Sequence, residues 1–301
     1  MSKLLRIIRD RNFLLLAGAA LGLLFGDAAR ATRPLIMPAL AMAMTVTLVS
    51  IEQIDLTRWR AVARTALVSI ALSYLLHGGL KLLLAWALGF REELWAGFVL
   101  DAAVPSGVAV IPLSYTLGGD AALALVATFS LYVCALAVMP LMVAALLGTS
   151  GVDPVSLLPA LTQLIVGPAI VARLLAATRL KGWVEQWRGA VVNWVFALLF
   201  FTVIGLNRDG LLSEPQTVLR ALLVALLCSL GISVVFEQFL RRMELTEARR
   251  RTYILLATIK NTSLAAATAL SLLGKRAALP AAVVSAANVG YMMWLNIRWR
   301  E

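Results

Sequence analysis

One apolar segment, residues 92–118, combines an acidic residue with residues that break helices. Asp101 lies one turn before Pro105, Ser106 and Gly107. Proline removes a backbone donor and clashes with the preceding helical turn, so a helix is expected to break at Pro105. Within a bilayer the freed backbone groups must face protein or a wet cavity. The segment therefore predicts a polar site in an apolar setting; the alternative is a simple proline kink.

A second apolar segment, residues 249–273, is interrupted by four consecutive polar residues, Lys260, Asn261, Thr262 and Ser263. A charge at the centre of a membrane helix costs at least about 2.5–3.5 kcal/mol on insertion scales. A lysine at this position therefore indicates a partner or a function. Asp101 is the expected partner, and the pair either takes part in coupling or serves only as a permanent brace.

His77 is the only histidine and lies inside a third apolar run. It is either a hydrogen-bonded packing residue or a group that handles protons near neutral pH. Lys81 follows one turn later, and it either extends to the membrane surface or lies inside the protein.

Catalytic motifs are absent from the sequence: there is no HExxH, no GxSxG and no Walker loop. Cys134 and Cys228 are isolated and have no metal-binding spacing. We therefore expect neither an enzyme nor a bound metal or cofactor.

The composition places these segments in a membrane. Hydrophobic residues make up 61% of the chain and charged residues 14%, against about 45–50% and about 25% in soluble domains. The net charge is +11, but the Lys and Arg residues lie mainly in short gaps between apolar runs. This distribution fits the positive-inside rule better than nucleic-acid binding, so the lipid bilayer is the expected partner.

Ten apolar runs are predicted to cross the bilayer, since about 20 apolar residues span one. They cover residues 12–26, 34–51, 63–89, 92–118, 120–147, 154–177, 186–206, 216–240, 249–273 and 277–299. With the N-terminus inside, most of the 27 Lys and Arg residues, including Lys3, Arg6 and Arg9, lie on the cytoplasmic side. We therefore expect an integral protein of a bacterial-type inner or plasma membrane, with both termini cytoplasmic.

The ten helices divide into two sets of five, about residues 12–147 and 154–299, within one transmembrane domain spanning 1–301. An odd number of helices per half gives the halves opposite orientations, which is the inverted-repeat plan of many secondary transporters. The interrupted segments are the fourth helix of each half. The sequence thus predicts an all-α membrane protein whose discontinuous fourth and ninth helices cross.

At these segments the chain resembles the bile acid:sodium symporter family, within a wider group that includes auxin-efflux carriers and arsenite exporters. The family has a Pro-Gly-Gly break, then a Gly-Asx-x-Ala-Leu loop, and later a motif close to Gln-Asn-Ser-x-Leu-Ala followed by Ala-Leu-Pro. The matching stretches are residues 92–97, 105–107, 115–125, 140–142, 260–266 and 278–282. Their order and spacing extend the resemblance over most of the chain.

The resemblance implies a panel domain and a core domain, and an organic anion usually carried with sodium. The positive ends of two half-helices are then expected to face the anion. Where the family has sodium ligands, this chain has Val110, Ile111 and Leu256, while Lys260 and His77 each align with a family Gln. Hard cations require several oxygen ligands, so sodium-independent transport is expected.

We therefore predict a secondary transporter of a small carboxylate-type anion. The predicted site residues are Ser106, Gly107, Asn261, Thr262 and Ser263 for binding, Pro105 for the break, and Asp101, Lys260 and His77 for charge. Lys260 is predicted to replace sodium, and a Lys–Asp pair to carry a proton, because burial favours the neutral form of an amine. The alternatives are an exporter similar to auxin-efflux carriers, or a receptor or channel on the same scaffold.

Overall fold

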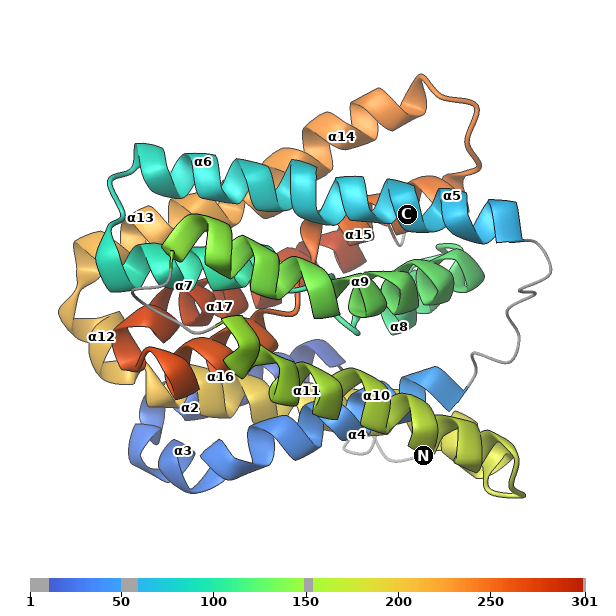
Figure 1. Ribbon diagram of the computed structural model, residues 1–301, viewed down its shortest axis with the longest axis horizontal. Coiled ribbons are helices and arrows are strands. Elements are labelled where there is room, and N and C mark those ends of the chain that lie inside the picture. The colour runs from blue at the N-terminus through green and yellow to red at the C-terminus, as the bar shows by residue number, and fades with distance from the viewer. Residues whose placement is uncertain (1–10, 50–58, 149–153, 300–301) are drawn as a thin grey trace.

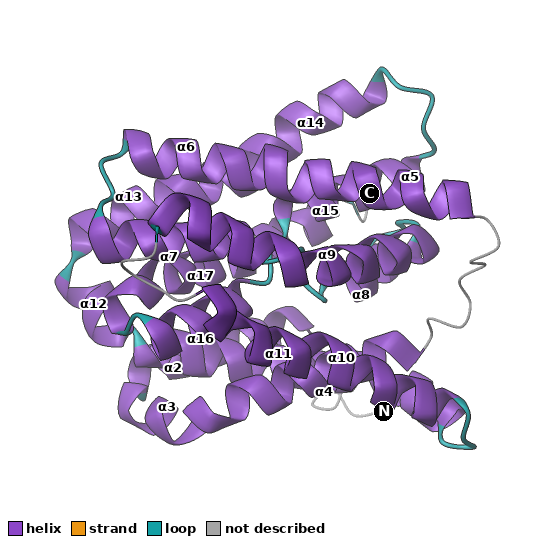
Figure 2. Cartoon of the chain, viewed as in Figure 1, coloured by secondary structure: helices purple, strands orange, loops and turns teal. Residues whose placement is uncertain are grey.

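The computed structural model describes residues 11–49, 59–148 and 154–299, which form helices joined by short loops (Figure 2). Lys3, Arg6 and Arg9, which contribute to the predicted orientation, lie outside these ranges. Among the described residues, six helices are long and apolar enough to cross a membrane: Gly26–Leu48, Trp59–Ala87, Ala121–Leu147, Lys181–Leu206, Pro215–Arg241 and Lys275–Arg298. Length and composition therefore agree with an integral membrane protein.

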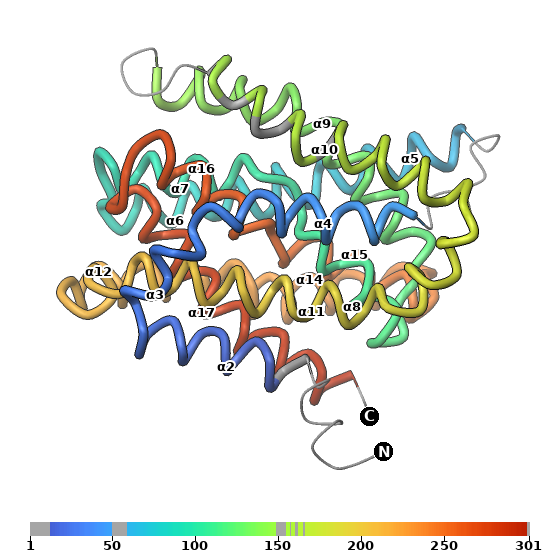
Figure 3. Tube along the Cα trace, turned by 90° about the horizontal axis from the view of Figure 1, so that it is seen from below, coloured from blue at the N-terminus to red at the C-terminus, as the bar shows by residue number. Residues whose placement is uncertain are grey.

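One group of helices packs together at the bottom of Figure 1. It contains α2 (Arg11–Leu24), α3 (Gly26–Thr32), η1 (Arg33–Leu35), α4 (Ile36–Leu48), α10 (Leu157–Ala176) and α11 (Lys181–Leu206). Figure 3 shows α2 running along α11. Gly18 and Gly22 permit this approach, because an added Cβ would lie 2.4 Å from the Ala197 carbonyl oxygen and 2.6 Å from that of Phe201. Small residues four apart are typical of close packing between membrane helices.

The remaining helices form a second group around α7 and α17 (Figure 1). Its first members are α5 (Trp59–Ile70), the π-helical η3 (Ala71–Gly78), α6 (Gly79–Ala87), α7 (Glu92–Ala103), α8 (Val110–Thr116) and α9 (Ala121–Leu147). Its later members are α12 (Arg208–Ser213), α13 (Pro215–Leu226), the π-helical η5 (Leu227–Gly231), α14 (Ile232–Arg241), α15 (Glu247–Thr258), α16 (Thr262–Leu272) and α17 (Lys275–Arg298). A 3-10 turn, η4 (Pro154–Ser156), precedes α10.

The second apolar helix begins earlier than predicted. Residues 26–48 form one continuous span of α3, η1 and α4, whereas the sequence predicted a start at residue 34. Pro34 lies in η1, a 3-10 segment that joins α3 to α4 without a break in the helical span. Arg30 and Arg33, which fall between the predicted helices 12–26 and 34–51, therefore lie on helical segments. The seventh helix likewise begins at Lys181 rather than at residue 186.

The loop after α8 is fixed to α15, which explains the Gly-Asp pattern there. The Asp120 carboxylate accepts a hydrogen bond from the Leu123 N–H and caps α9, and its own N–H donates to the Thr252 hydroxyl at 2.8 Å. A Cβ at Gly119 would lie 2.8 Å from that hydroxyl oxygen. Arg251 donates to the Leu117 carbonyl at 2.7 Å. The C-terminal end of α8 is therefore held in place by α15.

Candidate functional site

The first break separates α7 from α8. Val104 is extended (φ −64°, ψ 150°), as expected for a residue that precedes proline. The Ser106 hydroxyl donates to the Leu256 carbonyl at 2.9 Å and lies 3.2 Å from the Ser73 hydroxyl. Ser106 is fully buried, so its hydroxyl attaches the first break to α15.

The second break separates α15 from α16. Ile259 is extended (φ −112°, ψ 112°), and Asn261 caps α16, accepting a hydrogen bond from the Leu264 N–H at 3.2 Å. The Asn261 side-chain amide also donates to the Tyr132 hydroxyl at 2.6 Å. Asparagine competes with the helix for backbone hydrogen bonds, which favours a break at this residue.

The two breaks are joined to each other through their backbones. The Gly107 N–H donates to the Ile259 carbonyl at 3.0 Å, and the Asn261 N–H donates to the Pro105 carbonyl at 2.9 Å. Ser106 and Lys260 thus form an isolated antiparallel bridge. Each break provides hydrogen-bond partners for backbone groups that the other break leaves without an intrahelical partner. Buried backbone groups in an apolar setting require such partners. The predicted interruption of both segments, and their contact, are confirmed.

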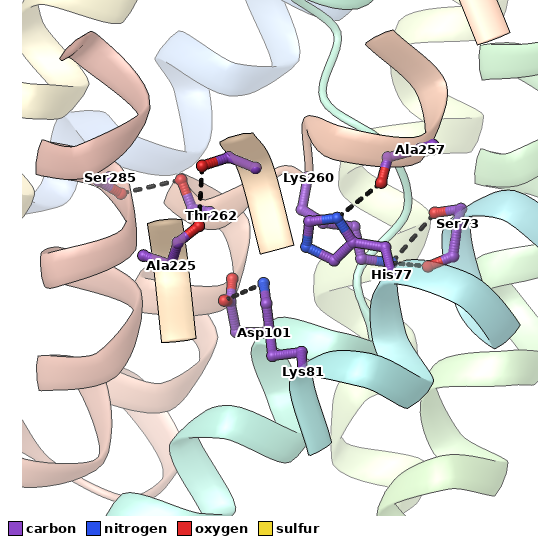
Figure 4. A network of polar contacts seen from close by, with 10 residues as sticks. Ser73, His77, Lys81, Asp101, Ala225, Ala257, Lys260, Thr262 and Ser285 are labelled. Atoms are coloured by element: carbon purple, nitrogen blue, oxygen red, sulfur yellow. Dashed lines mark hydrogen bonds and ion pairs between the residues drawn. The ribbon is translucent and has the colours of Figure 1, made fainter. Parts of the chain in front are cut away.

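Lys260 is buried at this junction, with 3% of its surface exposed. Its ammonium donates to the Ser73 carbonyl and to the Ser73 hydroxyl, both at 3.0 Å (Figure 4). It also lies 4.5 Å from the centre of the Tyr74 ring, a distance suited to a cation–π contact. These contacts of the ammonium are all with neutral groups of η3.

The predicted ion pair between Asp101 and Lys260 is wrong. Asp101 instead binds Lys81, with 2.6 Å between Oδ2 and Nζ and both side chains fully buried (Figure 4). Lys81 follows the π-helical segment η3, whose i→i+5 bonding rotates later residues relative to a regular helix. Lys81 is therefore an internal residue and occupies the place expected for Lys260. The second oxygen of Asp101 has no hydrogen-bond partner among the described residues.

His77 lies one turn before Lys81 on the same helix and is buried. Its Nδ1 lies 2.8 Å from the Ala257 carbonyl oxygen (Figure 4). A carbonyl only accepts, so Nδ1 carries a proton. Within the described part of the chain, Nε2 has no partner. His77 is thus held in place through Nδ1, while its other ring nitrogen is not used by the described residues.

The remaining predicted binding residues differ in whether their hydroxyl and backbone N–H groups already have hydrogen-bond partners in the protein. The Thr262 hydroxyl accepts from Ser285 at 2.8 Å, and Ser263 is buried at the start of α16. At the start of α8, by contrast, the Val110 N–H donates to the Gly107 carbonyl at 3.0 Å and the Ile111 N–H to that of Val108 at 3.4 Å. The loop thus closes the N-terminal end of α8, which the sequence had assigned to anion binding.

Sequence reasoning missed three partners of these residues: Ser73, Tyr74 and Tyr132. Ser73 and Tyr74 contact Lys260, and Tyr132 contacts Asn261. The sequence signal for these partners was a polar or aromatic residue within an otherwise apolar run. Ser73, for example, lies four residues before His77, which places it on the same face of a helix.

Two broken helices that meet inside a bundle of apolar helices, with a buried charge at the junction, are typical of secondary transporters. The fold and the site therefore define an integral membrane protein of the transporter class. The family model described as Sodium Bile acid symporter family matches residues 37–214, more than half of the chain. The chain belongs to this family, and the resemblance seen in the sequence is confirmed. The match includes the first break, whereas the second lies beyond it. No curated protein matches the chain.

Proposed function

We propose that this protein is a secondary transporter of a small carboxylate-type organic anion, and that the anion binds at the junction beside Lys260. One observation carries the proposal: the only acid described next to these groups, Asp101, is engaged by Lys81, so Lys260 contacts neutral groups alone. A buried charge is costly unless it is paired. A substrate carboxylate supplies the missing countercharge through short, charge-assisted hydrogen bonds.

The start of α16 offers further donors to the same anion. The first backbone N–H groups of a helix have no intrahelical acceptor, and the helix dipole is positive at this end. Asn261 has a second side-chain N–H besides the one bound to Tyr132. Thr262 accepts from Ser285 and keeps its own hydroxyl proton. Ser106 and Gly107 hold the junction in shape, and the anion contacts the groups on the side of the second break.

The scaffold proposed for this site is a bundle of ten transmembrane helices in two inverted sets of five, with both termini in the cytoplasm of a bacterial-type cell. A feature of the helices supports the two sets. Each broken helix follows a helix that contains a π-helical segment, η3 before α7 and η5 before α15. Such segments are rare and occur frequently at functional sites.

Three side chains and one charge argue against a sodium site at this junction. Val110, Ile111 and Leu256 have side chains without oxygen, and a nearby ammonium repels a cation. We therefore propose transport without sodium, in which the proton on Lys260 accompanies the anion. When the anion leaves, the uncompensated amine favours its neutral form and releases that proton. Lys81 and Asp101 remain paired throughout, and His77 Nε2 provides an acceptor for a proton in transit.

The test is uptake into proteoliposomes, with candidate carboxylates first selected by their effect on thermal unfolding. Sodium is replaced by choline, and a pH gradient, acidic outside, is imposed or omitted. We expect uptake that does not need sodium, is stimulated by the gradient and is lost in Lys260→Gln. The surface variant Lys275→Gln, which makes the same change at an exposed position, should transport normally.

Several results would contradict the proposal. Strong sodium dependence of the wild type would exclude the coupling. Unchanged uptake by Lys260→Gln would make Lys260 a structural residue. Counterflow of labelled substrate separates a carrier from the alternatives, because a receptor gives no accumulation and a channel gives no counterflow.

A further inference from the structure

A cavity of about 450 Å³ lies between the two groups of helices, away from the junction. Its lining comes from α3, η1 and α4 on one side and from α16 on the other (Figure 1). Arg30, Arg33, Thr268 and Ser271 provide the polar lining, and Ile36 and Met37 are among the apolar residues. The cavity therefore combines guanidinium groups and hydroxyls with an apolar wall.

The cavity has an unbalanced positive charge. No acidic residue is among the described residues that line it. Arg33 makes no ion pair with any described residue, and Arg30 pairs only with Asp27, at 3.4 Å. The Asp27 and Arg30 side chains are 89% and 67% exposed, and exposed pairs of this kind are weak. Both arginines are thus available to an anion, and a cleft lined by one sign of charge concentrates ions of the opposite sign.

The cavity shares a helix with the junction. Thr268 follows the cap residue Asn261 by seven residues, which is about two helical turns or about 10 Å along the axis. Residues separated by two turns lie on one face of a helix. The face of α16 that begins at the junction therefore leads to the wall of the cavity.

We propose that this cavity is a vestibule that binds carboxylate-type organic anions before they reach Lys260. Arg30 and Arg33 hold the carboxylate, since the planar guanidinium matches it with two parallel hydrogen bonds. Ile36 and Met37 accommodate the apolar part of the anion. The passage onward to Lys260 rests on the proposed function, whereas the attraction of anions by the cavity does not.

The attraction is tested without any substrate. Ser271 is exposed and lines the cavity, so Ser271→Cys is made in a Cys134→Ala/Cys228→Ala background. Its reaction rates with anionic 2-sulfonatoethyl and cationic 2-trimethylammonioethyl methanethiosulfonate are compared with those of a free thiol. We expect the anionic reagent to be favoured about tenfold at low salt. Arg30→Gln/Arg33→Gln should remove this preference.

A matched control removes the same charge elsewhere. Arg60 and Arg179 are exposed and lie outside the cavity, so Arg60→Gln/Arg179→Gln should keep the preference for the anionic reagent. If the Arg30→Gln/Arg33→Gln variant prefers the anionic reagent as strongly as its parent does, the proposal that the cavity attracts anions is overturned. This result would leave the proposed transport function intact.

The role in transport is tested with the carboxylate that gives uptake in the wild type. Arg30→Gln/Arg33→Gln should raise the concentration for half-maximal uptake at least about threefold at low salt, and less at high salt, with the maximal rate unchanged. An unchanged half-maximal concentration would overturn this role. Absence of uptake by the wild type would refute the proposed function, while the thiol measurements would still decide whether the cavity attracts anions.

Discussion

The two helix breaks lie against each other but differ in what they contribute. Residues 104–109 form the longer break, and its Ser106 hydroxyl and the N–H groups of Gly107, Val110 and Ile111 all bind protein carbonyls. Residues 259–261 form the shorter break, and it brings in the ammonium of Lys260. The first break shapes the backbone and the second supplies the charge. In this junction, small residues of the first break allow the two backbones to meet, and Lys260 of the second break supplies the charge that an anion would bind.

The two buried lysines show the same contrast. Lys81 has an acidic partner at 2.6 Å, whereas Lys260 contacts the oxygens of Ser73 and the ring of Tyr74. A paired charge stabilises its surroundings only while both partners remain. A charge with neutral partners is instead open to an anion from outside. We therefore interpret Lys81 as a brace and Lys260 as a binding group.

The largest effect is expected from removing the brace. Lys81→Met leaves Asp101 buried without its partner, and a broken buried pair destabilises a protein by about 3–5 kcal/mol. The measurement is unfolding of the purified protein in detergent. The double variant Lys81→Met/Asp101→Leu removes both charges and should recover most of the lost stability.

A surface pair provides the control for this measurement. Arg276 lies 3.8 Å from Glu214, and both side chains are partly exposed. Arg276→Met should change the free energy of unfolding by no more than about 1 kcal/mol. If Lys81→Met is as mild as this control, Lys81 is not a brace and the contrast between the two lysines fails.

An intermediate effect is expected from filling the space at the first break. An added Cβ at Gly107 would lie 3.1 Å from the Lys260 carbonyl oxygen, so Gly107→Ala should push the breaks apart and destabilise the protein by about 1–3 kcal/mol. At Gly79, by contrast, an added Cβ meets nothing within 4 Å. Gly79→Ala should be neutral or stabilise by up to about 1 kcal/mol, because alanine favours helix. Equal effects of the two changes would show that the breaks are not tightly packed.

The breaks themselves were predictable from the sequence. Proline, glycine and a run of polar residues are local signals, since each acts on the backbone of its own segment. Pro105 and the run from Lys260 to Ser263 therefore indicated where α7 and α15 end. The early start of the second helix was missed because Asp27, Arg30 and Arg33 interrupt the apolar pattern before Pro34, although α3 and η1 are helical there.

The partners of the buried charges were not predictable in the same way. Which residues meet depends on how each helix is rotated about its axis, and η3 changes that rotation within the helix that carries His77 and Lys81. Spacing along the sequence contains no signal for a π-helical segment. Asp101 was therefore correctly identified as a paired acid but assigned to the wrong lysine. The Arg30 and Arg33 cavity was missed because it is formed by helices far apart in the sequence.

A smaller effect on stability than at Lys81, and the largest effect on transport, is expected at Lys260. Lys260→Met loses the hydrogen bonds to Ser73, which for a charged donor are worth about 1.5–3 kcal/mol each. It also removes a buried ammonium, which relieves a penalty of at least about 2.5–3.5 kcal/mol. The two terms oppose each other, so the free energy of unfolding should change by less than it does in Lys81→Met, while uptake is lost because the anion has no countercharge. Lys260→Arg keeps the charge and should retain more uptake than Lys260→Met. A loss of stability as large as that of Lys81→Met would instead make both lysines braces, and the anion would have to bind elsewhere.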